Sequence, residues 1–157
     1  MKQLINKLAQ DFPDITIQVA DSFYWSPELK TVFIDTKNTT DSGKWSLLHE
    51  FSHALLDHTT YTSDIELLQL ESQAWHKAKQ LALAYNVTIS DDYSENCLDS
   101  YRDWLHTRST CPQCSNRSLQ QDHNHYQCFN CLHVWKVSKS RMCRPYRLSA
   151  AHTISSS

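Results

Sequence analysis

The segment from Leu47 to Leu56 limits what this chain can fold into more than any other. It reads Leu-Leu-His-Glu-Phe-Ser-His-Ala-Leu-Leu without Gly or Pro, which predicts a helix. Residues four apart share one face of a helix, so His49 and His53 can present two imidazole nitrogens to one metal ion, with Glu50 beside them. A hydrolytic zinc site needs these groups: two neutral nitrogen ligands and a carboxylate that accepts a proton from water. The pattern also arises by chance in unrelated chains, but the apolar helical flanks and a suitable third ligand favour the zinc site.

The elements before this segment are short. Helical spacing of apolar residues predicts a helix over 2–11, and alternation predicts a strand over 15–19. Aromatic and β-branched residues predict strands at 23–25 and 31–35, joined by a turn at Pro27. We expect this hairpin to contribute to the core, and its edge strand could pair with an extended peptide substrate.

A second long helix is predicted from Ser63 or Asp64 to about Tyr85. Its apolar stripe consists of Leu67, Leu68, Ala74, Trp75, Ala78, Leu81, Ala82 and Tyr85. Glu71 falls in the middle of this stripe, where a carboxylate costs free energy unless something neutralises it. We therefore predict Glu71 as the third zinc ligand, which leaves an open position for water. The alternatives are a Glu71 that is hydrated at the rim or paired with a Lys, and Glu66, which lies on the more polar face.

Four of the six cysteines form two C-x-x-C pairs separated by thirteen residues. They are Cys111, Cys114, Cys128 and Cys131. Two such pairs can wrap four thiolates around one zinc ion, as in a zinc ribbon, and the closed site would fold the module and not catalyse. Between the pairs, His123 and His125 are interpreted as hairpin residues, and Tyr126 and Trp135 as the core of the ribbon. The sequence assigns no role to Cys143, and Cys97 is most simply a small buried residue of a helix predicted over about 93–106.

Charge is unevenly distributed along the chain. Residues 1–110 carry a net charge of −7 and residues 111–157 a net charge of +5, within a total of −2. Cations interleaved with aromatic residues at the C-terminal end suggest contact with nucleic acid as a second kind of partner, or a solvated tail that docks on the acidic part of the chain. These residues are Trp135, Lys136, Lys139, Arg141, Arg144, Tyr146 and Arg147.

The segment His49–His53 followed by Glu71-Ser72-Gln73-Ala74 resembles the gluzincin metallopeptidases, and among them the compact ImmA/IrrE-type members. The resemblance covers roughly residues 1–90 and rests on the order of elements as much as on the motif. It implies cleavage of a protein substrate that could be a regulatory protein such as a repressor, with the ribbon as the targeting element. Related gluzincins often place Asp four residues after the glutamate, where this chain has Trp75, so that partner is absent or supplied elsewhere.

Two other histidines compete as third ligand. His58 lies one position short of the third His of the extended metzincin motif, and Leu56 stands where that motif has Gly. His76 lies roughly 140° around the helix from Glu71, so the two cannot both face the metal. A His76 ligand would shift the resemblance toward SprT-like DNA-associated proteases, which also carry a zinc ribbon.

Together these features predict an α+β fold in which a mostly helical zincin-like domain with a small sheet (1–107) is followed by a ribbon with a basic tail (108–148) and a disordered end (149–157). We expect a zinc endopeptidase with one catalytic and one structural zinc ion, in which Glu50 is the general base. The oxyanion donor stays open, with Tyr61, Tyr85 and His106 as candidates. The alternative is a non-catalytic zinc-dependent protein that binds nucleic acid or protein. No apolar run approaches the ~20 residues that span a bilayer, and the first residues lack a signal-peptide core, so we expect a cytoplasmic protein with no membrane partner.

Overall fold

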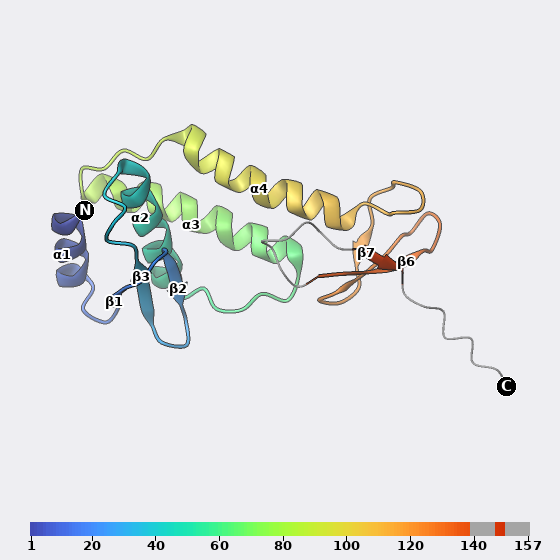
Figure 1. The fold of residues 1–157 in the computed structure, drawn as a ribbon, viewed down its shortest axis with the longest axis horizontal. Coiled ribbons are helices and arrows are strands. Elements are labelled where there is room, and N and C mark those ends of the chain that lie inside the picture. The colour runs from blue at the N-terminus through green and yellow to red at the C-terminus, as the bar shows by residue number, and fades with distance from the viewer. Residues whose placement is uncertain (139–146, 150–157) are drawn as a thin grey trace. The chain divides into compact units, whose positions relative to one another are not determined.

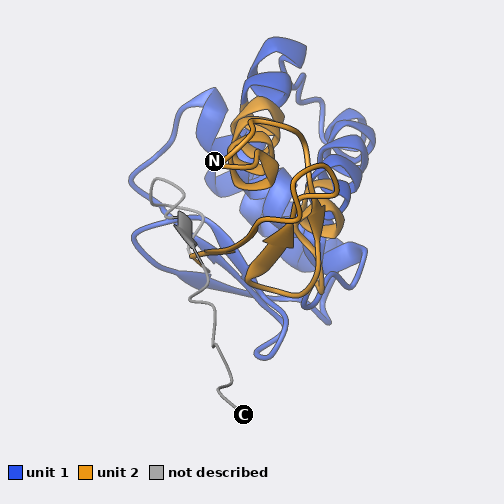
Figure 2. Cartoon of the chain, turned by 90° about the vertical axis from the view of Figure 1, so that its right-hand side faces the viewer, with its two compact units in different colours: residues 1–60, 69–96 blue, residues 61–68, 97–157 orange. Residues whose placement is uncertain are grey.

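The computed structural model describes residues 1–138 and 147–149 of the chain (Figure 1). It divides into two compact units, which Figure 2 shows in different colours. Unit 1 consists of residues 1–60 and 69–96, and unit 2 of residues 61–68 and 97–157. Helices and small sheets are both present, so the predicted α+β class is confirmed.

Unit 1 contains three strands and four helical segments. Its elements are α1 (Lys2–Asp11), β1 (Thr16–Val19), β2 (Tyr24–Ser26), β3 (Thr31–Ile34), α2 (Asp41–Leu55), most of α3 (Asp64–Ala84) and the first turns of α4 (Asp91–Ser109). The three strands, α1 and α3 begin within a few residues of the predicted positions. The Ser63 hydroxyl accepts the Glu66 backbone N–H at 3.3 Å, so Ser63 is the N-cap of α3.

The three strands of unit 1 form a sheet in the order β1-β3-β2. β2 and β3 are antiparallel, which confirms the predicted hairpin, whereas β1 pairs with β3 in parallel. β2 is therefore an edge strand, and α2 packs against β2 and β3. This arrangement places the exposed edge of the sheet next to the helix that carries the His-Glu-x-x-His motif.

The start of α2 is fixed by local chemistry. The Thr40 hydroxyl accepts the Gly43 backbone N–H at 3.3 Å, which caps the helix. Gly43, the one glycine of the chain, lies so close to the carbonyl oxygen of Asn38 that any side chain there would collide with it. The inner face of α2 is completely buried through Leu47, Leu48 and Phe51. A rigid, well-anchored helix thus carries the motif.

Unit 2 contains a four-stranded antiparallel sheet in the order β4-β5-β6-β7. The strands are β4 (Leu119–Gln120), β5 (His125–Gln127), β6 (Val134–Val137) and β7 (Arg147–Ser149). Tyr126 and Trp135 are buried and stack with ring centroids 5.7 Å apart, beside the buried Cys111 and Cys128. The small core that the sequence predicts for the ribbon is therefore present.

A buried ion pair lies in the same unit. Arg108 Nε donates to Asp64 Oδ2 at 2.6 Å, and both side chains are almost fully buried. The Tyr126 hydroxyl also donates to Asp64 Oδ2 at 2.6 Å, and the Trp135 indole N–H donates to the Arg108 carbonyl at 3.1 Å. The first turn of α3 and the last turn of α4 are thereby joined to the core of the cysteine module.

Part of the predicted basic segment falls outside the described residues. Lys139, Arg141, Cys143, Arg144 and Tyr146 are among these positions. β7 ends at Ser149, the residue at which the predicted tail begins, and 150–157 also lie outside the description.

Candidate active site and metal centres

α2 brings its two motif histidines together. The Nε2 atoms of His49 and His53 lie 3.2 Å apart, and the two side chains are 7% and 9% exposed. One helical turn separates the residues, and the buried face of α2 directs both rings toward α3. The spacing of the motif therefore produces the pair of nitrogen donors that the sequence predicts.

Glu71 on α3 completes this group. Its Oε2 lies 3.1 Å from His49 Nε2, and its Oε1 lies 3.8 Å from His53 Nε2. Burial by itself raises the pKa of the Glu71 carboxyl, but hydrogen bonds and charge from the two imidazoles outweigh it and lower the pKa to about 2. Glu71 is thus held as a buried carboxylate.

The three donors fit a zinc ion. Ligands at the usual Zn–N and Zn–O lengths of about 2.0–2.1 Å in a tetrahedron lie about 3.3 Å from one another. The separations between the group's nitrogen and oxygen atoms, 3.1, 3.2 and 3.8 Å, are close to that value. Three donors leave one tetrahedral position for water or substrate, as in catalytic zinc sites.

The competing third ligands are not part of this group. The ring of His76 is exposed and hydrogen-bonds with the Gln80 side chain at 3.0 Å, and Glu66 binds the backbone and hydroxyl of Thr62 at 2.7 Å. Among the described residues, only His49, His53 and Glu71 converge in this way, besides the four ribbon cysteines.

Glu50 lies beside the histidines and also contacts the sheet. Its Oε2 accepts the backbone N–H of Trp25 at 3.0 Å, which ties it to the edge strand β2. Burial raises the pKa of the Glu50 carboxyl and the neighbouring Glu71 adds to this, while His49, His53 and the Trp25 amide oppose it. A carboxyl with a raised pKa accepts and releases protons closer to neutral pH, which suits a general base.

Four cysteines converge in unit 2. Cys111 Sγ lies 3.6 Å from Cys131 Sγ, and Cys114 Sγ lies 3.5 Å from Cys128 Sγ. Four sulfurs around one zinc ion at about 2.3 Å lie about 3.8 Å apart, so this cluster also fits the metal. Hydrogen bonding, first from the Asn116 backbone N–H, lowers the pKa of Cys114 to about 6, and the thiolate is the form that binds metal.

The comparisons with known proteins agree with this geometry. Residues 12–144 match the family described as the IrrE N-terminal-like domain, Peptidase_M78. The chain belongs to this family. No curated protein and no solved structure matches it.

Membership makes the chain a metallopeptidase of the IrrE/ImmA type, which acts on protein and depends on zinc, and the predicted resemblance is confirmed. The match covers the cysteine cluster as well as the His/His/Glu group. It gives no support for binding to nucleic acid. In the part of the chain that the structure describes, no helix combines the length and apolar character needed to cross a membrane.

Two side chains near the histidines have roles that the motif does not show. His58 is buried, and its Nδ1 lies 2.8 Å from His53 Nδ1. His58 was predicted only as a possible third ligand, but it contacts His53 and is not part of the converging group. Burial, followed by the charge of His53, lowers the pKa of His58 and favours its neutral form. Its position just past the C-terminal end of α2 is the sequence signal that accompanies this contact.

Trp75, four residues after Glu71, contacts a motif histidine. Its ring stacks on His49 with centroids 4.2 Å apart, and His49 Nδ1 has no hydrogen-bond partner in the described structure. The orientation of His49 is therefore fixed by stacking, whereas that of His53 is fixed by a hydrogen bond.

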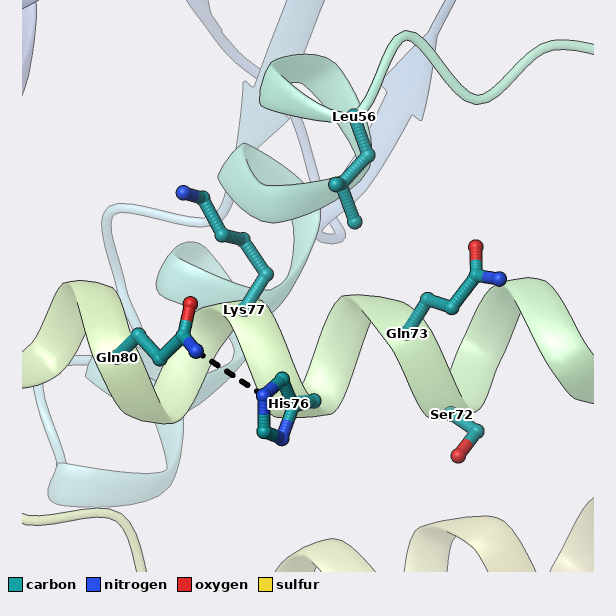
Figure 3. Close-up of a pocket in the computed structure, with 6 residues that line it drawn as sticks. All are labelled: Leu56, Ser72, Gln73, His76, Lys77 and Gln80. Atoms are coloured by element: carbon teal, nitrogen blue, oxygen red, sulfur yellow. Dashed lines mark hydrogen bonds between the residues drawn. The ribbon is translucent and has the colours of Figure 1, made fainter.

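The outer face of α3 in unit 1 lines a pocket (Figure 3). Its residues are Leu56, Ser72, Gln73, His76, Lys77 and Gln80. Gln73 connects this pocket with the metal group, because its Oε1 lies 3.3 Å from His58 Nε2. Of the candidate oxyanion donors, Tyr85 donates its hydroxyl to Asp11 at 2.7 Å, and Tyr61 and His106 belong to unit 2.

Proposed function

We propose that this metallopeptidase is an endopeptidase with one catalytic and one structural zinc ion, and that Glu50 is its general base. The observation that carries the proposal is the convergence of His49, His53 and Glu71 within one buried group, with Glu50 next to them in the sequence. A zinc ion in this site supplies Lewis acidity, which activates water and polarises a peptide carbonyl. The Cys111, Cys114, Cys128 and Cys131 cluster holds the structural ion.

Glu50 is placed to move the proton of the reaction. Its carboxylate takes a proton from the attacking water and then gives it to the leaving amine nitrogen. The Trp25 backbone N–H, 3.0 Å from Glu50 Oε2, keeps the carboxylate oriented. This chemistry uses the raised pKa of Glu50, since a weaker acid is a stronger base.

The edge strand β2 provides a binding surface for an extended peptide. Trp25 lies opposite Val32 in the antiparallel pair, and its N–H points away from β3 toward Glu50. The N–H and C=O groups of one residue lie on the same side of a strand, so the Trp25 carbonyl is also directed outward. A peptide that pairs with this edge would pass beside Glu50, which suits a protein substrate. The substrate that we propose is a regulatory protein such as a repressor, cleaved in the cytoplasm. The ribbon of residues 108–148 would bind this protein and bring it to the zincin-like domain of residues 1–107.

Exchange of Glu50 for Gln tests the catalytic part. Glu50→Gln keeps the side-chain shape and loses the base, so we expect two zinc ions per chain and cleavage of a cellular peptide mixture reduced by about 10²–10⁴-fold. Mass spectrometry of the products and metal analysis of both proteins provide the measurements. The proposal would be contradicted if the wild-type protein bound a single zinc ion and Cys111→Ser removed it. It would also be contradicted if Glu50→Gln cleaved peptides as fast as the wild type.

A further inference from the structure

The C-terminal end of α2 turns back onto the motif. Asp57 adopts a left-handed conformation with φ of 52°, and its N–H bonds the Ala54 carbonyl at 3.1 Å. The His58 N–H bonds the His53 carbonyl at 3.0 Å. These two hydrogen bonds form a Schellman motif, which ends a helix by folding the next residue back over its last turn. The backbone thus places the ring of His58 beside that of His53.

The hydrogen bonds of these side chains fix the position of each proton. His53 Nε2 faces His49 and Glu71, so a metal there needs its lone pair, and the ring proton of neutral His53 must be on Nδ1. That N–H can donate to His58 Nδ1, 2.8 Å away. His58 then carries its own proton on Nε2, which faces Gln73 Oε1 at 3.3 Å. A single tautomer assignment satisfies all three residues.

We propose that His58 and Gln73 are positioning residues: they hold His53 in the tautomer and ring orientation that present Nε2 to the catalytic zinc. Metal-binding histidines usually donate their second N–H to a carboxylate or carbonyl, and here a neutral imidazole relayed to a carboxamide takes that part. The inference rests on the proposed function, because it concerns the same zinc site.

Trp25 connects this relay with the general base. Its indole N–H donates to the His58 carbonyl at 2.8 Å, while its backbone N–H donates to Glu50 at 3.0 Å. One residue of β2 therefore fixes both the carboxylate and the turn that carries His58. A shift of this turn moves two functional groups at once.

Substitutions at His58 test the relay through zinc affinity. His58→Phe keeps an aromatic ring but has no acceptor, and we expect its affinity for zinc at the first site to fall by about 10–100-fold. His58→Asn offers a side-chain oxygen near the position of Nδ1 and should recover most of the affinity, and Gln73→Leu should show a smaller loss. His76→Phe is the matched control, because His76 lines the pocket together with Gln73 but its ring hydrogen-bonds with the Gln80 side chain.

Affinity is measured on the full chain by competition with a chelator, and zinc at the ribbon cysteines is the internal reference. The inference would be overturned if folded His58→Phe bound zinc with unchanged affinity, or if the Phe and Asn variants lost affinity equally. In either case, two zinc ions bound to the wild type would still support the proposed function. A wild type with zinc only at the cysteines would contradict both.

Imidazole nitrogen resonances of the zinc-loaded wild type provide a test that does not depend on variant folding. We expect His53 protonated at Nδ1 and His58 protonated at Nε2. A His58 protonated at Nδ1 would overturn the relay, because His58 could not then accept the His53 proton.

Discussion

The two candidate metal sites of this chain are built in opposite ways. In unit 2 all four ligands come from two short C-x-x-C turns, and the cysteines themselves form part of a small core with Tyr126 and Trp135. In unit 1 the candidate ligands come from two helices, α2 and α3, and His49 and Glu71 are 22 positions apart. A larger apolar core anchors these helices. We expect the first kind of site to need its metal to fold, and the second to be formed by the protein before a metal binds.

The surroundings of the ligands differ in the same sense. The cysteine sulfurs accept hydrogen bonds from nearby backbone groups, such as the Gln113 N–H at 3.4 Å from Cys111 Sγ and the Cys131 N–H at 3.5 Å from Cys128 Sγ. The histidines depend on side chains distant in sequence, with Trp75 stacked on His49 and Gln73 reached through His58. The cysteine cluster is thus supported by local backbone groups, and the His/His/Glu group by tertiary contacts.

The largest expected effect is the loss of the ribbon zinc. Cys111→Ser should release this ion and unfold the ribbon, since structural zinc contributes about 10–16 kcal/mol in zinc-finger peptides. His49→Ala should instead release the other ion and leave both units folded. Metal analysis combined with proteolysis of the two variants measures the contrast. If His49→Ala unfolded unit 1 as thoroughly as Cys111→Ser unfolds the ribbon, the proposed difference between the centres would be wrong.

The next effect concerns the ion pair that supports unit 2. Asp64→Asn leaves the buried Arg108 without its charge partner, and the free energy of unfolding should fall by about 3–5 kcal/mol. Tyr126→Phe removes only the hydroxyl that donates to Asp64, so we expect a smaller loss of about 1–1.5 kcal/mol. Denaturant unfolding of the zinc-loaded variants gives both values. Equal losses would mean that the charge of Asp64 contributes nothing beyond its hydrogen bond with Tyr126.

A smaller effect is expected at the end of α2. Gly adopts the left-handed conformation of Asp57 without steric cost, so Asp57→Gly should stabilise unit 1 by about 0.5–1 kcal/mol. Asp57→Val, which disfavours that conformation, should destabilise it and lower zinc affinity by displacing His58. Thermal unfolding and chelator competition distinguish these outcomes. If Asp57→Val bound zinc with unchanged affinity, the conformation of this turn would have no effect on the zinc site.

The smallest effect concerns the start of α3. The backbone N–H of Thr62, followed by its hydroxyl, lowers the pKa of Glu66. A carboxyl with a lowered folded-state pKa stabilises the protein above its unfolded value of 4.5, and this contribution is lost as pH falls through the folded value. The stability difference between wild type and Glu66→Gln should therefore be present at neutral pH and disappear in acid. A difference that stays constant across this range would show that the charge of Glu66 has no part in capping.

Local patterns in the sequence determined much of this protein. Helical spacing located α1, α2 and α3, and the motif spacing together with a carboxylate in an apolar stripe identified the group of His49, His53 and Glu71. Two C-x-x-C pairs identified the cysteine cluster. These features could be predicted because each depends on the periodicity of one element or on the chemistry of ligands close in sequence.

Other features were decided only by the tertiary structure. The parallel pairing of β1 with β3, which makes β2 an edge strand, depends on backbone hydrogen bonds between separate segments. The contact of His58 with His53 depends on a left-handed residue that no periodicity reveals, and the Asp64–Arg108 pair joins residues 44 positions apart. The segment from Leu47 to Leu56 contains the two histidines, but folding supplied Glu71 and the side chains that orient the group, because these are close in space and not in sequence.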